Sequence, residues 1–80
     1  MNTNLHKFYQ QLKSDQDYQS WAIPSDIRVG IETAIAQASP ESLNNYFIIG
    51  ITVYSRPSNE TLERWQSYAN NLAIFCLILD

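Results

Sequence analysis

Apolar residues recur along this chain at the spacing of helix faces. The stretch from 58 to 79 carries one stripe with alternating steps of three and four residues: Leu62, Trp65, Ala69, Leu72, Cys76 and Leu79. Such spacing predicts an amphipathic α-helix. Polar residues fill the opposite side only as far as Asn71, and Ile74, Leu77 and Ile78 then fall in that same sector. We therefore expect the end of this helix to be apolar all round and to meet another surface.

The first part of the chain predicts two further helices. Residues 4 to 13 place four apolar side chains at i, i+3, i+4 and i+7: Leu5, Phe8, Tyr9 and Leu12. The sequence 14 to 17, Ser-Asp-Gln-Asp, either breaks this helix or caps a short piece that runs through Tyr18 and Trp21. Pro24 predicts a turn, and Ser25 or Asp26 is expected to cap a helix that continues to residue 38.

Two local signals refine these elements. Gly30 stands inside the second predicted helix, where glycine costs up to about 1 kcal/mol against alanine and is tolerable if another helix packs closely. Ser39-Pro40-Glu41 is a helix start, with a capping hydroxyl, a preset φ and an acid near the helix dipole. The apolar stripe that follows comprises Leu43, Tyr46, Phe47, Gly50, Ile51 and Tyr54.

The composition of residues 46 to 54 leaves a second architecture open. This segment is almost wholly β-branched or aromatic, which is typical of a strand. The pattern favours an all-α fold, a compact array of about four helices. The alternative is an α+β fold with a βαβ unit, in which strands 46–54 and 72–79 are joined by a helix from 59 to 71.

Length and charge bound the class of protein. Eighty residues predict a single small domain over 1–80, which buries about 63% of its surface on folding and gains from a partner or a second copy. The net charge of −3 is spread along the chain without a basic patch. Nucleic acid is therefore not an expected partner.

The expected location is cytoplasmic, without membrane attachment. The first residues contain no apolar signal segment, and the apolar runs are too short to cross a bilayer. The lone Cys76 lies between Phe75 and Leu77 and reads as a small core residue of a reducing compartment.

No motif for catalysis is present, so we do not expect an enzyme, a cofactor or a metal site. His6 is the lone histidine and has no neighbouring nucleophile or ligand set. The acid pair Asp15 and Asp17 is expected to cap backbone in a turn. Glu60 and Glu63 are expected to favour a helix dipole, with Arg64 forming an i,i+4 ion pair with Glu60.

These observations predict a small non-catalytic interaction or regulatory protein that binds a protein partner or itself. Its contact surface is expected to be apolar and rich in aromatic residues, with five candidates: Trp65, Tyr68, Ile74, Leu77 and Ile78. The alternative function is a small-molecule-binding domain or minor enzyme with a pocket near His6.

Overall fold

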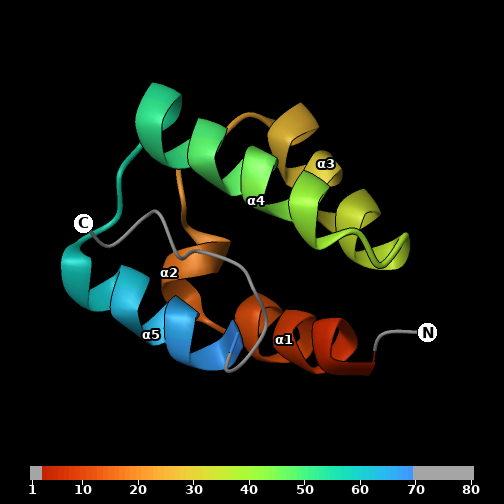
Figure 1. The fold of residues 1–80 in the computed structure, drawn as a ribbon. Helices are drawn as coiled ribbons and strands as arrows, with labels where there is room; N and C mark the ends of the chain where they lie inside the picture. Colours follow the sequence, from red (N-terminus) through yellow and green to blue (C-terminus); the bar gives the residue numbers. More distant parts are fainter. Residues whose placement is uncertain (1–2, 70–80) are drawn as a thin grey trace.

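The computed structural model describes residues 3–69, and this part of the chain consists of helices and loops without a strand (Figure 1). The order is α1 (Thr3–Lys13), α2 (Gln16–Gln19), α3 (Ser25–Ala36), α4 (Pro40–Ile49), the π-helix η1 (Gly50–Tyr54) and α5 (Asn59–Ala69). The predicted all-α class is confirmed. The alternative βαβ unit is wrong for 46–54, which is helical throughout, and its second strand, 72–79, lies outside the described residues.

Residues 46–54 form a helix despite their strand-like composition because the helical spacing buries one side. Leu43, Phe47 and Ile51 are all buried, one turn apart, on the side that faces the core. Ser39 accepts a hydrogen bond from the backbone N–H of Ser42, and Pro40 is the first helical residue, as predicted. Packing and a strong start therefore outweigh the weak local preference of β-branched residues.

The last turn of this long helix widens. The N–H of Ser55 donates to the carbonyl of Gly50 at 2.9 Å, which is the i to i−5 bond of a π-helix. The wider turn shifts the register of the stripe, and Tyr54, expected among the core residues, is half exposed. Ile51 is the last buried position of the stripe.

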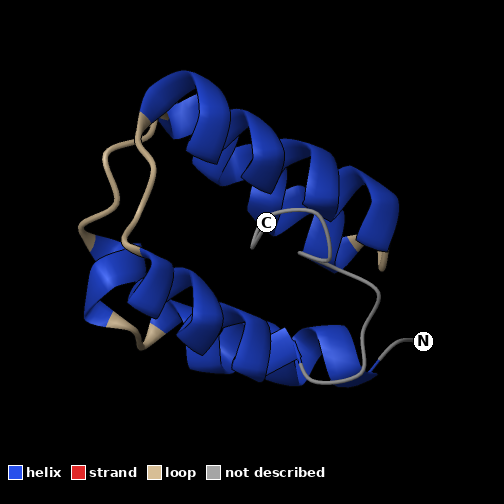
Figure 2. Ribbon diagram, turned by 60° about the vertical axis from the view of Figure 1, so that its left-hand side comes forward, coloured by secondary structure: helices blue, strands red, loops and turns tan. Residues whose placement is uncertain are grey.

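The helices lie in two layers. Figure 1 shows the α3–α4 pair above a lower layer of α1, α2 and α5. Figure 2 shows that both loops connecting the layers, the one before α3 and the one before α5, lie at the same end. Trp21 joins these loops, because its indole Nε1 donates to the carbonyl of Ser55 at 2.7 Å.

Aromatic side chains from both layers form the centre of the core. Ring centroids of neighbouring members lie 5.1 to 6.5 Å apart: Phe8, Tyr18, Trp21, Phe47 and Trp65. Phe47 from the upper layer stacks on Trp21 at 5.5 Å and meets Trp65 edge-on at 6.0 Å. Such contacts add to the stabilisation that burial provides.

Both glycines mark close approaches. A Cβ on Gly30 would stand 2.3 Å from the Tyr46 ring, so α3 and α4 approach each other closely at this glycine. A Cβ on Gly50 would stand 2.7 Å from the Trp21 ring. The first turn of η1 therefore lies directly against the loop that connects the layers.

The helix ends follow the predicted signals with one correction. Asp15 caps α2, and Ser58 accepts a hydrogen bond from the N–H of Thr61 at the start of α5. Neither Ser25 nor Asp26 is the N-cap of α3, because the helix begins at Ser25 and Pro24 holds the cap position in extended geometry. Pro24 presets that geometry, and Asp26, inside the first turn, accepts a hydrogen bond from the N–H of Ile27.

Candidate functional site

A buried carboxylate connects α2 to α5. The Asp15 side chain is 3% exposed and accepts backbone N–H bonds from Asp17 and Tyr18, which makes it the N-cap of α2. It also accepts bonds from the Arg64 guanidinium at 2.8 and 3.2 Å and from the Tyr68 hydroxyl at 2.7 Å. Asp15 therefore holds together two helices that are far apart in the sequence.

The titration of this group follows from its partners. The Arg64 guanidinium, followed by the Tyr68 hydroxyl and the Tyr18 N–H, holds the pKa of Asp15 well below its usual range against the opposing effect of burial. The same contact raises the pKa of Arg64, and the bond to Asp15 raises the pKa of Tyr68. Such a carboxylate stays ionised at neutral pH, which suits a structural ion pair and not a general acid.

Asp17 extends the network toward the surface. Its Oδ2 accepts from Arg64 at 2.5 Å and from the Thr61 hydroxyl at 2.9 Å. Arg64 thus bonds both aspartates, and the expected ion pair with Glu60 is wrong. The aspartates were expected only to cap backbone, since neither of their distant partners is visible in the spacing.

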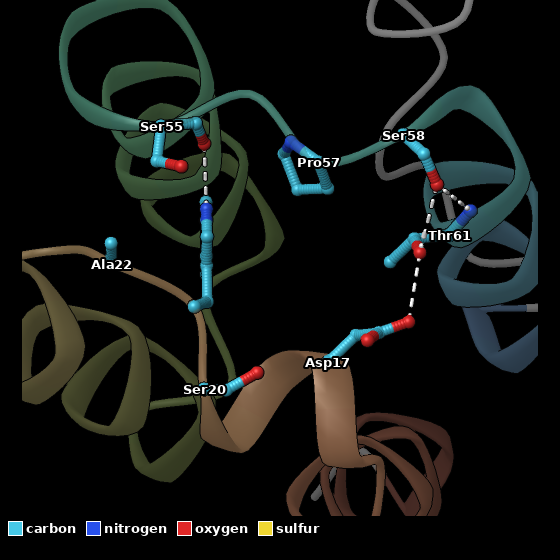
Figure 3. Close-up of a pocket in the computed structure, with 8 residues that line it drawn as sticks. Asp17, Ser20, Ala22, Ser55, Pro57, Ser58 and Thr61 are labelled. Carbon is cyan, nitrogen blue, oxygen red and sulfur yellow. Dashed lines mark hydrogen bonds between the residues drawn. The ribbon is translucent and has the colours of Figure 1, made fainter.

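An open hollow of about 300 Å³ lies beside this network, between α2, the loop that precedes α5 and the start of α5. Figure 3 shows Ser58, Thr61 and Asp17 joined by hydrogen bonds along one wall and the Ser55 carbonyl bonded on the other. Most polar groups of the wall are thus engaged within the chain. The hollow offers a ligand few free partners.

A different part of the surface is apolar. Three large side chains of α4 and η1 point to solvent: Ile49 is 38%, Val53 66% and Tyr54 50% exposed. Ile49 and Val53 stand four residues apart, in a row with exposed Asn45 and Glu41. We call the surface made by Asn45, Ile49, Val53 and Tyr54 the outer face of α4–η1.

The predicted interface residues lie in different environments. Trp65 is 1% exposed and belongs to the core cluster, while Tyr68 is partly buried and bonds Asp15. Ile74, Leu77 and Ile78 lie outside the described residues. Sequence reasoning missed Ile49 and Val53, although an i,i+4 row opposite the Leu43–Phe47 stripe in an uncharged segment was a signal for them.

His6 lies on the exposed surface of α1. It exchanges a hydrogen bond with the Gln10 amide at 3.1 Å. The hollow next to it is shallow and lined by residues of that helix. Among residues 3 to 69, no group of His, Cys, Asp and Glu side chains is arranged to hold a metal ion.

Comparison of the chain with protein-family models, with curated proteins and with solved structures finds no match. Within the described helices, none combines the length and the apolar character needed to cross a bilayer. The site must therefore be interpreted from its own geometry.

Proposed function

We propose that this chain is a non-catalytic protein-interaction domain and that the outer face of α4–η1 is its contact surface. The observation that carries the proposal is the exposure of Ile49, Val53 and Tyr54 next to a well-filled aromatic core. Single exposed apolar residues are ordinary, but neighbouring ones on successive turns of one helix are typical of a binding surface.

Two further features support this surface. It includes a π-helical turn, which is energetically less favourable than an α-helical turn and is found frequently at functional sites. Tyr54 combines a large apolar ring with a polar hydroxyl, and tyrosine is enriched among the residues that dominate binding energy.

The proposal places the contact surface elsewhere than the sequence pattern did. Trp65 is used within the core, and Tyr68 is held by Asp15. The network around Asp15 connects helices, and its carboxylates are ionised at neutral pH and engaged by Arg64, so they supply no general acid there. We therefore favour binding over catalysis.

A pair of variants tests the proposal. A photo-crosslinking residue at position 53 identifies a candidate partner, which is then purified and titrated with the wild type, Val53→Asp and Gln11→Asp. Both variants add one negative charge at an exposed position, but Gln11 lies on α1 in the other layer. Val53→Asp is expected to weaken binding at least tenfold, as for an interface hot spot, and Gln11→Asp to leave it unchanged. Equal effects of the two variants would show that the outer face is not the contact surface.

A further inference from the structure

We infer that the outer face of α4–η1 binds a second copy of this chain, with the two α4–η1 segments packed antiparallel across a two-fold axis. This inference rests on the proposed function and names the partner for that surface. A two-fold dimer uses the same patch on both copies, so the patch must be complementary to itself.

The face has the shape that such a contact requires. From Pro40 to Tyr54 the chain is one continuous helical segment, about 22 Å long at 1.5 Å per residue. Glu41, Asn45, Ile49 and Val53 follow one another at steps of four residues and are all exposed. This row lies along one side of the segment and places the apolar residues at its η1 end.

The charge pattern restricts where two copies can meet. The chain carries a net charge of −3, so two copies repel each other over most of their surfaces. No charged residue occurs from Ser42 to Ser55, which makes this face a place where the copies approach at low electrostatic cost.

The two ends of the face carry opposite charges. Glu41 is exposed at the start of α4, and Arg56 is exposed just past the end of η1, where its Nη2 donates to Asn59 Oδ1 at 2.8 Å. An antiparallel arrangement brings Glu41 of each copy toward Arg56 of the other, and it also opposes the two helix dipoles. A parallel arrangement would place like charges together at both ends.

The size of the apolar patch sets the expected strength. Three large exposed side chains provide a few hundred Å² at most, well below the roughly 800 Å² that each partner buries in a standard interface. We therefore expect a weak, concentration-dependent dimer in the micromolar to millimolar range.

Sedimentation equilibrium of the full chain between micromolar and millimolar concentration tests the inference. The wild type is expected to show a monomer–dimer equilibrium. Val53→Asp is expected to raise the dimer dissociation constant at least tenfold, and Gln11→Asp to leave it unchanged. Circular dichroism checks that each variant is folded. A wild type that remains monomeric throughout would overturn the inference.

Charge reversal tests the orientation. Glu41→Arg brings the net charge from −3 to −1, and general repulsion alone would then predict tighter association. The antiparallel contact predicts the reverse, about fivefold weaker association at low salt, because the introduced guanidinium then meets Arg56 of the other copy. The double variant Glu41→Arg, Arg56→Glu keeps the net charge of −3 and is expected to restore the wild-type constant. Tighter association of the single variant, or no recovery in the double variant, would contradict the arrangement.

These results separate the inference from the proposed function. If the wild type is monomeric but a purified crosslinked partner binds it more tightly than it binds Val53→Asp, the dimer is rejected and the outer face remains the proposed contact surface. If the wild type is monomeric and the two variants, Val53→Asp and Gln11→Asp, bind every crosslinked partner with equal affinity, both the dimer and the proposed contact surface are rejected.

Discussion

Ala38 adopts a backbone conformation that its own side chain disfavours. Its φ is 53°, in the left-handed region, just beyond the end of α3. The N–H of Ser39 donates to the carbonyl of Ala34 and that of Ala38 to the carbonyl of Ile35, so the helix ends in a Schellman motif. Glycine is the residue that this position usually carries, because a Cβ costs about 1 kcal/mol or more there.

Ala38→Gly is accordingly expected to stabilise the protein by about 0.5–1 kcal/mol, less than the full strain because glycine also gains freedom in the unfolded chain. Urea denaturation at pH 7 measures the change. Ala36→Gly, inside the last turn of the same helix, is the control and is expected to lower stability by about as much. Equal losses in both variants would show that Ala38 is not strained.

Residue by residue, the sequence predicted roles that depend on near neighbours. The Ser39 cap and the first helical position of Pro40 were both expected and both occur. The second role of Asp15 was not predicted, because Arg64 is 49 residues away and spacing reveals only partners within one helix. The i,i+4 spacing predicted Glu60 as the partner of Arg64, whereas the structure pairs Arg64 with Asp15.

Among the elements, the attachment of α2 to α5 depends on charge. Asp15 is buried, while Arg64 is 37% exposed and retains Asp17 as a second partner. Water therefore compensates part of any loss, and the cost of neutralising Asp15 is smaller than for a fully buried pair.

Asp15→Asn is expected to lower the free energy of unfolding by about 2 kcal/mol at pH 7, since asparagine still caps the helix but does not attract Arg64 as an ion. The pKa of Asp15 is lower in the folded protein than the value of about 3.9 in the unfolded chain. Its stabilisation is therefore complete above about pH 5 and is lost progressively as the pH falls through the unfolded value toward the folded one. The difference between wild type and variant should thus shrink below pH 4.

Urea titrations at pH 7, 4 and 2.5 measure this difference. Glu63→Gln, on the exposed side of α5, changes the net charge equally and serves as the control, with little expected effect. A difference between wild type and Asp15→Asn that stays constant with pH would assign the cost to lost packing and not to the ion pair.

The elements themselves were predictable to the extent that their signals are local. The start of α4, with the Ser39 cap and Pro40, was predicted correctly. The strand interpretation of 46–54 was wrong because composition is a weaker signal than the helical spacing of the buried residues. The π-turn of η1 was not predictable, because it arises where Gly50 lies against the Trp21 ring, and Trp21 belongs to a distant part of the sequence. The half-exposed position of Tyr54 follows from that turn, whereas Val53 continues the exposed row of Asn45 and Ile49.

For the whole molecule, the aromatic cluster joins the two layers, together with hydrogen bonds such as those that Arg28 of α3 donates to the Tyr18 and Trp21 carbonyls. The layers are connected by two short loops at one end, and between them Phe47 is the upper layer's main aromatic contact with Phe8, Trp21 and Trp65. A chain of this size has a total stability on the order of 5 kcal/mol, comparable to the contribution of one such ring. We therefore expect neither layer to fold without the other.

Phe47→Ala provides the test, with an expected cost of about 3–5 kcal/mol from lost contacts and the remaining cavity. Because both tryptophans lie in the cluster, tryptophan fluorescence reports the contact between layers, while far-ultraviolet dichroism reports the helices. If the two layers fold as one cooperative unit, the fluorescence and dichroism signals decrease together, both in the variant and when the wild type is denatured. Asn45→Ala, two residues earlier on the outer face, should keep both signals, since it removes no core contact. If the variant kept most of its helical signal while its tryptophans became exposed, the helices of both layers would be stable without their contact, and the cluster would join two folded parts instead of forming them.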